Sequence, residues 1–450
     1  MTVQFKHLEK GSTVGSGSYV FRKYAEASPT PQLEPFLTFS SPSSFTLEVV
    51  NNIKYWDGTL QYSINKTNWT TWAGTSAISS ASDGTKHNIY VRGAGNTYIT
   101  GTNVNTNLTR AVWRLNGSNI SIKGSIETLL DYATVELGNH PAMATDCYKQ
   151  LFAYTNTSPN SNIVDISGLI LSAQTLTANC YYGLFQNNSG ITNLPQINAN
   201  VLAAACFYRM FYGCSSILSI PNNYLPITTL AGYCYYGMFQ NCSSLTSIPT
   251  GLLPATTLEE ACYLNMFRAT GITSIPTGLL PATTLQVKCY YCMFYNCTNL
   301  TSIPNNLLPA TTMFNECYTA MFRGCTSLTN VCALPATTLA DYCYNLMFTV
   351  CTNLISIPAL PALTIDGYSC YQDMFNGCSK IKLSTTQVDD YTNEYRIPIN
   401  GTGSVTGPYA LNDMFTGTGG TFTGRPSINT TYYTSNAIVN TDGTITPAAS

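Results

Sequence analysis

The segment Leu230-Ala-Gly-Tyr-Cys-Tyr-Tyr-Gly-Met-Phe-Gln-Asn-Cys-Ser-Ser-Leu-Thr-Ser-Ile-Pro249 decides the fold, because related copies of it recur along most of the chain. The first cysteines of successive copies lie 26, 28, 28, 27, 28, 26 and 27 residues apart. A period of this length indicates a repeat protein whose units stack on one another. The aligned cysteines are Cys180, Cys206, Cys234, Cys262, Cys289, Cys317, Cys343 and Cys370, with a divergent copy beginning at Cys147.

Each repeat contains apolar residues at the spacing expected for one face of a helix. Leu258, Cys262 and Met266 fall at positions i, i+4 and i+8, and Thr257-Leu-Glu-Glu260 matches a capping box. The sequence therefore predicts a short helix in each unit. A Leu-x-x-Ile-Pro motif follows and predicts a short strand that ends at proline. The clearest examples of the motif are Leu245–Pro249, Leu300–Pro304 and Leu354–Pro358.

The pattern Met-Phe-x-x-Cys-x-x-Leu-x-x-Ile-Pro resembles the BspA-like leucine-rich repeats of bacterial surface proteins. Copies that add Leu-Pro-Ala-Thr-Thr-Leu and Cys-Tyr-x-x-Met-Phe resemble a subfamily common in gut bacteria and their phages, over residues 140–384. The resemblance implies an α/β repeat solenoid of the leucine-rich-repeat type, with one short strand and one short helix in each unit of about 27 residues. Asn188 and Thr270 depart from the pattern by replacing the second cysteine, and Cys332 stands where proline is usual.

Residues 36–125 differ in kind from the repeats and predict a small all-β domain, sandwich-like and of immunoglobulin type. Four segments alternate in polarity or are rich in β-branched residues, and Asp-Gly or Asn-Gly turn signals separate them. All four tryptophans of the chain lie in this region and are expected in its core. The predicted strands are Phe45–Val50, Leu60–Ile64, Asn88–Arg92 and Ile120–Gly124.

The remaining segments complete a four-part organisation. Residues 1–35 are interrupted by Gly, Ser and Pro and predict an arm that anchors the chain to a larger assembly. Residues 126–384 form the predicted solenoid. Residues 385–450 contain a degenerate unit around Met414 and Phe415, which predicts a cap over the last open coil.

The composition bounds the partners of the protein. Charged residues make up 9% of the chain and the net charge is −2, which gives no electrostatic reason to bind nucleic acid or an anionic membrane. The apolar runs are too short for a membrane span, and the N-terminus lacks the pattern of a signal peptide. We therefore expect no nucleic-acid partner, no membrane insertion and no secretion.

The cysteines form two ladders, which we expect to be free structural thiols. Cys289-Tyr-Tyr-Cys292 is a lone C-x-x-C motif that lacks two of the four ligands zinc needs. The three histidines accompany no nucleophile motif. We expect no metal, no cofactor and no catalytic residue, so the protein is predicted not to be an enzyme. The second ladder, at the position where leucine-rich repeats use Asn or Cys to bond the neighbouring backbone, is Cys214, Cys242, Cys297, Cys325, Cys351 and Cys378.

A row of tyrosines is the remaining candidate for ligand binding. Two residues after the first cysteine of a repeat lie Tyr182, Tyr208, Tyr236 and Tyr291, with Leu264 interrupting the row. Two interpretations stay open: the rings pack sideways between adjacent coils, or they face outward and stack on sugar rings. In the second case the surrounding Ser, Thr and Asn would pair with sugar hydroxyls, and a neutral glycan should bind with weak salt dependence.

Together with the resemblance, these features predict a non-enzymatic bacteriophage virion protein, a fibre or decoration protein on the virion surface. Its arm would dock on other virion proteins, and its repeats would recognise a glycan or protein of the host surface. Two alternatives stay open: an adhesin of the same repeat family on a bacterial cell surface, and a purely structural virion component. A homo-oligomer is compatible with each of these.

Overall fold

The structure, a computed structural model, describes residues 34–50, 55–100, 113–154 and 162–446. The predicted anchoring arm, residues 1–35, lies outside the described residues except for its last two. From Glu34 onward the chain forms one compact unit.

The first part of this unit consists of two antiparallel sheets. One sheet has the order β4-β3-β7-β1-β9, with β6 also pairing with β7, and the other has the order β5-β2-β8. The four strands predicted from polarity alternation are confirmed as β2, β3, β7 and β9. The bounds are β1 (Leu37–Ser41), β2 (Thr46–Val49), β3 (Thr59–Ser63), β4 (Thr70–Trp72), β5 (Ile78–Ser79), β6 (Ala81–Ser82), β7 (His87–Ala94), β8 (Trp113–Asn116) and β9 (Ile120–Ser125).

Tryptophans join the two sheets. Trp72 of β4 meets Trp113 of β8 with ring centroids 5.3 Å apart, and Trp56 lies 5.6 Å from Trp72. All three side chains are buried, as expected, whereas Trp69 is partly exposed beside Phe36. The rings contribute a large share of the buried apolar surface that holds the sheets face to face.

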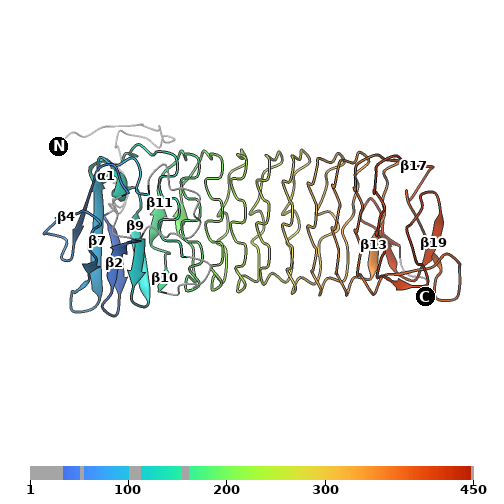
Figure 1. The fold of residues 1–450 in the computed structure, drawn as a ribbon, viewed down its shortest axis with the longest axis horizontal. Helices are drawn as coiled ribbons and strands as arrows, with labels where there is room; N and C mark the ends of the chain where they lie inside the picture. Colours follow the sequence, from blue (N-terminus) through green and yellow to red (C-terminus); the bar gives the residue numbers. More distant parts are fainter. Residues whose placement is uncertain (1–33, 51–54, 101–112, 155–161, 447–450) are drawn as a thin grey trace, which may run out of the picture. The chain divides into compact units, whose positions relative to one another are not determined.

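The larger sheet continues directly into the repeats. Strand β9 pairs in parallel with β10 (Ile163–Asp165) and β11 (Leu169–Leu171), and β11 pairs in parallel with β12 (Gln196–Ile197). Helix α1 (Thr128–Glu136), the only α-helix in the described part of the chain, packs against β7 beside this junction. Strands β9, β10 and β11 lie side by side at this junction (Figure 1). One hydrophobic core therefore runs from the paired sheets into the first coils.

Beyond the junction the chain winds into successive coils, each hydrogen-bonded to the next (Figure 1). Straight segments of neighbouring coils lie parallel, as the bridge between Ser274 and Ser302 shows. The predicted strand at Leu354–Pro358 contains β13 (Ser356–Pro358), whereas Leu300–Pro304 carries only that isolated bridge. The strand predicted at Leu245–Pro249 is wrong, because those residues form a straight segment without strand pairing. The coils therefore form a β-rich repeat architecture, in agreement with the period of the sequence.

The helix predicted in each repeat is wrong, because a chain of tight turns occupies its place in the described coils. Every fourth residue is left-handed, as at Gly237 and Asn241 with φ of 55° and 63°. Every second amide donates to the next coil, for example that of Tyr235 to the Cys262 carbonyl at 3.0 Å. The amides between them, such as that of Met238, donate three residues back, whereas a helix directs every bond four residues back. We name these segments the turn ladder; they span 144–154, 177–188, 203–214, 231–242, 259–270, 286–297, 314–325, 340–351, 367–378 and 407–418.

The four-residue period explains why the turn ladder resembled a helix. Apolar residues recur at Cys234, Met238 and Cys242, and a period of four is close to the 3.6 residues of a helical turn. Glycine and asparagine recur with the same period, at Gly237 and Asn241, because these residues enter the left-handed region at least cost. This second pattern is the signal of the turn ladder that the helix prediction did not use.

The predicted capping box is wrong for the same reason. Thr257 forms a parallel bridge with Thr284 of the next coil, so its backbone belongs to a straight segment. The Glu260 carboxylate accepts a hydrogen bond from the Tyr233 hydroxyl of the preceding coil. Both residues therefore connect coils.

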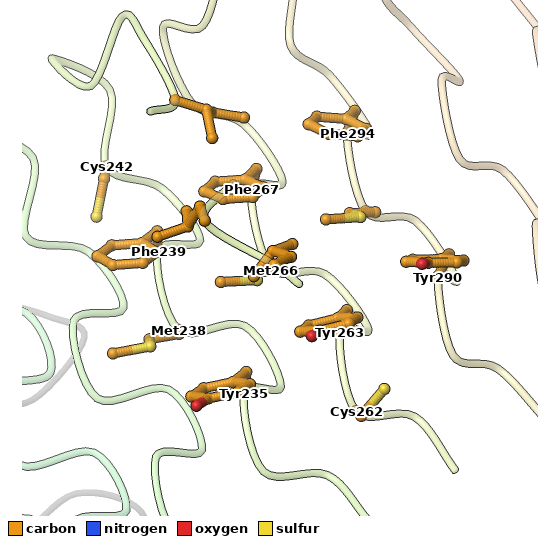
Figure 2. Packing of buried hydrophobic residues seen from close by; sticks show 14 of the residues in the cluster. Tyr235, Met238, Phe239, Cys242, Cys262, Tyr263, Met266, Phe267, Tyr290 and Phe294 are labelled. Atoms are coloured by element: carbon orange, nitrogen blue, oxygen red, sulfur yellow. The ribbon is translucent and has the colours of Figure 1, made fainter. Parts of the chain in front are cut away.

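Two columns of buried aromatic rings run through the turn ladder with one ring per coil, except that the last coil has Leu411 in place of a ring in the first column (Figure 2). Tyr235 stacks on Tyr263 and Phe239 stacks on Phe267, both with centroids 5.9 Å apart and planes 4° from parallel. Stacking at every step fixes the register between coils. The columns are Tyr148, Tyr181, Phe207, Tyr235, Tyr263, Tyr290, Tyr318, Tyr344 and Tyr371, and Phe152, Phe185, Phe211, Phe239, Phe267, Phe294, Phe322, Phe348, Phe375 and Phe415.

Rings that stand edge-on close both ends of the phenylalanine column. Phe152 meets Phe39 and Trp113 at interplanar angles of 67° and 78°. Phe415, in the degenerate last unit, meets the buried Tyr395 at 84°. The stack therefore ends against the paired sheets on one side and against the C-terminal strands on the other.

The C-terminal strands pair with one another and with the last coils. Strand β13 pairs in parallel with β20, β14 with β17 and β15 with β18, whereas β16 pairs antiparallel with β19 and β20 with β21. The bounds are β14 (Thr364–Ile365), β15 (Lys382–Leu383), β16 (Asn393–Arg396), β17 (Ser404–Val405), β18 (Gly419–Gly420), β19 (Thr431–Thr434), β20 (Ala437–Val439) and β21 (Ile445–Thr446).

Candidate functional site

Three of the four candidate tyrosines form one continuous stack on the turn ladder. Tyr182 and Tyr208 have centroids 4.4 Å apart, and Tyr208 and Tyr236 have centroids 4.2 Å apart, all nearly parallel. The rings are half-buried, and burial raises the pKa of the Tyr182 and Tyr208 hydroxyls. Neighbouring rings cover both faces of Tyr208, so a sugar can reach its edge and hydroxyl only.

The fourth candidate, Tyr291, stands apart from this stack. Leu264 occupies the same position in the intervening coil and is buried. Tyr291 is half-buried, and desolvation raises the pKa of its hydroxyl. The structure therefore brings together Tyr182, Tyr208 and Tyr236 but leaves Tyr291 outside the group.

A second group of tyrosines, not selected from the sequence, is more exposed. Tyr342, Tyr368 and Tyr409 expose 36%, 37% and 52% of their surface. Tyr342 and Tyr368 are tilted by 49° at 5.2 Å, and Tyr368 and Tyr409 are edge-on at 5.4 Å. These rings do not cover one another face to face, which leaves ring surface open. Tyr342 and Tyr409 occupy left-handed positions of the turn ladder and Tyr368 precedes one, so a helical interpretation of the repeats gave no signal for them.

Basic side chains of the coils gather on the turn ladder. Between residues 163 and 378 the chain contains four basic residues, Arg209, Arg268, Lys288 and Arg323, and all four lie in it. Arg209 lies over Tyr208, Tyr212 and Tyr236, with its guanidinium carbon 5.2 to 5.5 Å from each ring centroid. The outer side of the turn ladder, which we name the ladder face, therefore combines rings and cations.

The straight segment that follows the turn ladder presents an uncharged surface whose threonine hydroxyls mostly donate hydrogen bonds within the protein. It exposes one threonine in each of several coils. The Thr301 hydroxyl donates to the Thr273 carbonyl at 3.2 Å, and the Thr329 hydroxyl to the Thr301 carbonyl at 3.1 Å. Because these hydroxyls donate to the protein itself, fewer donors remain for a ligand on this side than on the ladder face.

The cysteines are structural thiols. All 17 are free and buried, and those of the second ladder donate to a phenylalanine carbonyl of the preceding coil, as Cys297 does to Phe267 at 3.1 Å. Asn188 makes the equivalent bond to the Phe152 carbonyl at 2.7 Å. Thr270 donates to the Phe267 carbonyl of its own coil at 2.9 Å. Burial raises the pKa of the Cys289 thiol to about 12, so its reactive thiolate form is disfavoured near neutral pH.

A buried carboxylate occupies the junction between the paired sheets and the first coils. Glu127 accepts hydrogen bonds from Ser172 at 2.7 Å and from His140 Nδ1 at 2.8 Å, and with His140 it lines a cavity of about 280 Å³. In a hydrolytic triad the histidine lies between the carboxylate and the serine. Here the carboxylate lies between the other two, so the arrangement differs from that of a Ser-His-Asp triad. Among the described residues no three His, Cys, Asp or Glu side chains gather as a metal site.

Comparison of the chain with protein-family models, with curated proteins and with solved structures finds no match. In the described part of the chain no helix has the length and apolar character needed to cross a bilayer. The chemistry of the ladder face is therefore the basis for assigning a function.

Proposed function

We propose that this protein is a non-enzymatic recognition protein that binds cell-surface sugars through exposed rings of its ladder face. The observation that carries the proposal is the group Tyr342, Tyr368 and Tyr409, which we name the tyrosine cluster. Its rings keep open surface in three successive coils, in contrast to the parallel stack that covers Tyr208.

The chemistry around the tyrosine cluster suits a sugar. A pyranose presents an apolar face that packs on an aromatic ring and hydroxyls that donate to nearby acceptors. The carboxylates of Asp373 and Asp413 lie on the same coils as Tyr368 and Tyr409 and are at least partly exposed. They can accept hydrogen bonds from sugar hydroxyls while the rings hold the apolar face.

We place the protein on the surface of a bacteriophage virion, as a fibre or decoration protein. The support is the resemblance of its repeats to the BspA-like leucine-rich repeats and the Gly-, Ser- and Pro-interrupted sequence of residues 1–35, which suits an arm docked on other virion proteins. Weak single sites would then act together, because many copies on one particle raise the effective affinity. A bacterial adhesin of the same repeat family would present the same ladder face.

The test is the binding of the full chain to an array of bacterial surface polysaccharides. The triple variant Tyr342→Ser, Tyr368→Ser and Tyr409→Ser should lose binding with little change in melting temperature, because these side chains are exposed. The control Leu218→Ser, Ile355→Ser and Leu363→Ser removes apolar side chains that are 60%, 49% and 50% exposed outside the turn ladder, and should bind normally. Unchanged binding by the tyrosine variant, or no binding by the wild-type chain, would contradict the proposal.

A further inference from the structure

Two arginines hold one tyrosine between them in the middle of the turn ladder. The Ala269 amide donates to the Tyr295 carbonyl and the Asn296 amide to the Arg323 carbonyl, so Arg268, Tyr295 and Arg323 are register neighbours in successive coils. The guanidinium carbons of Arg268 and Arg323 lie 4.5 Å and 5.7 Å from the Tyr295 ring centroid. Arg209 lies two coils earlier, so one arginine occurs in every second coil. It stands three residues before the repeat position of Arg268, and its guanidinium carbon lies 5.2 Å from the ring of Tyr212, which holds that position.

None of these three guanidiniums is neutralised by a carboxylate in the described part of the chain. The ion pairs found there belong to other residues. Lys288, the fourth basic residue between residues 163 and 378, pairs with Glu316 at 3.2 Å. Arg209 Nε is buried and has no hydrogen-bond partner. Stacking uses the face of a guanidinium and leaves its N–H edge free to donate. The three side chains, each partly exposed, therefore present positive charge that no carboxylate of the described residues pairs with.

A carboxylate is the group that this arrangement fits. The planar fork of a guanidinium matches the two oxygens of a carboxylate. Two coils rise by about 10 Å, which corresponds to two sugars of an extended chain. Glu259, Glu260 and Glu316 lie on the same turn ladder, and their charge disfavours a densely charged chain such as nucleic acid.

We infer that Arg209, Arg268 and Arg323 bind an acidic polysaccharide that carries a carboxylate on about every second sugar, with Tyr295 in contact with the sugar between two carboxylates. This inference rests on the proposed function and names the ligand class for a second part of the same ladder face. For this part of the ladder face, a charged ligand replaces the neutral glycan expected from the sequence. Its binding should weaken as salt is added, because salt screens the attraction between exposed charges.

The probe is hyaluronan, which carries one carboxylate in each pair of sugars, compared with its methyl ester, which lacks the charge, and with double-stranded DNA. The full chain should bind hyaluronan at low salt, and the methyl ester and DNA at least about tenfold more weakly. Arg268→Gln with Arg323→Gln should lose at least about tenfold in affinity for hyaluronan. Lys288→Gln, the matched control on the same ladder, should bind hyaluronan normally because Lys288 is already paired.

Equal binding of hyaluronan and its ester would overturn the inference, as would tighter binding of DNA, or unchanged affinity of the arginine double variant. Circular dichroism of the double variant establishes that it is folded. If hyaluronan fails to bind while polysaccharides on the array still bind through the tyrosine cluster, the inference is wrong and the proposed function stands. If no polysaccharide binds at all, both are wrong.

Discussion

The paired sheets before residue 126 and the turn ladder after it satisfy their backbones in different ways. In the sheets, strands such as β7 exchange hydrogen bonds with a neighbour on each side, over antiparallel registers of up to five residue pairs. In the turn ladder, amides alternate between a carbonyl of the next coil and a carbonyl three residues back. Half of the ladder's bonds therefore resemble a sheet and half resemble a row of turns. A coil of the turn ladder therefore satisfies all its backbone hydrogen bonds only when the neighbouring coil is present.

The two regions also differ in what fills their cores. The sheets enclose three tryptophans, Trp56, Trp72 and Trp113, and the fourth, Trp69, lies partly exposed in the same region. The coils enclose stacked tyrosine and phenylalanine rings together with all 17 cysteines, every one of which is buried. The coils therefore contain many ionisable groups that must stay neutral, and the sheets contain few. This difference should separate the two regions experimentally.

The largest expected effect is the loss of the coils in alkali. Burial raises the pKa of several thiols from 9.0 to about 12. Above pH 9 the unfolded chain loses these protons while the folded chain keeps them, so stability that is present below pH 9 falls as the pH rises towards 12. Each such thiol removes about 1.4 kcal/mol of unfolding free energy per pH unit. The thiols concerned are Cys206, Cys289, Cys332, Cys343 and Cys378.

Two signals can follow this alkaline transition. Far-ultraviolet circular dichroism reports mainly on the coils, and tryptophan fluorescence reports on the paired sheets. We expect the dichroism to change at or below the pH at which the fluorescence changes. The variant Cys343→Ala should flatten the pH dependence of stability. Fluorescence that changes first, or stability that stays constant from pH 9 to 12, would be incompatible with neutral buried thiols in the coils.

A smaller effect distinguishes the two cysteine ladders. Cys297 donates its S–H to the Phe267 carbonyl, whereas Cys289 of the first ladder has no such bond to a neighbouring coil. Both side chains are fully buried, so Cys→Ala removes a similar volume at each site. Cys297→Ala should therefore lose about 1 kcal/mol more of unfolding free energy than Cys289→Ala, measured by urea titration. Equal losses would show that the thiol hydrogen bond contributes nothing.

The smallest predicted effect distinguishes a turn ladder from a helix, because the same substitution changes the unfolding free energy in opposite directions in the two. Val350 is left-handed, with φ of 62°, and 42% exposed, which is a strained position for a β-branched residue. Val350→Gly should raise the unfolding free energy by about 0.5 kcal/mol, since relief of strain exceeds the entropy that glycine adds to the unfolded chain. In a helix the same change would lower it by a similar amount. The control Val388→Gly, at an exposed residue without positive φ, should lower stability.

The sequence predicted the repeat period and the strands of the paired sheets because both depend on patterns with one interpretation. A sequence period near 27 residues indicates stacked repeats and no other architecture, and polarity that alternates at every residue fits only a strand. The spacing of Cys234, Met238 and Cys242 fits a helix and a four-residue turn equally well. Only Gly237 and Asn241, spaced by the same four residues, separate the two, and the residues at the left-handed positions vary from coil to coil.

The site was harder to predict than the fold. The row Tyr182, Tyr208 and Tyr236 was found, but whether a ring faces solvent depends on turn geometry and on the residue one coil away. Tyr342 and Tyr409 occupy left-handed positions, with φ of 56° and 59°, but Ala261 and Ser369 occupy the same position in other coils and are buried, so the position alone does not predict exposure. Arg268 and Arg323 lie far apart in the sequence and flank one tyrosine only because the coils repeat in register.

The central claim is that each repeat contains a turn ladder and no helix, since the ladder face and both binding proposals depend on it. Far-ultraviolet circular dichroism of the full chain tests this directly. The described part of the chain has one helix of 9 residues, so the helical double minimum should be weak and a β-type signal should dominate. A strong helical double minimum, of the size expected for one helix in every repeat, would contradict the account.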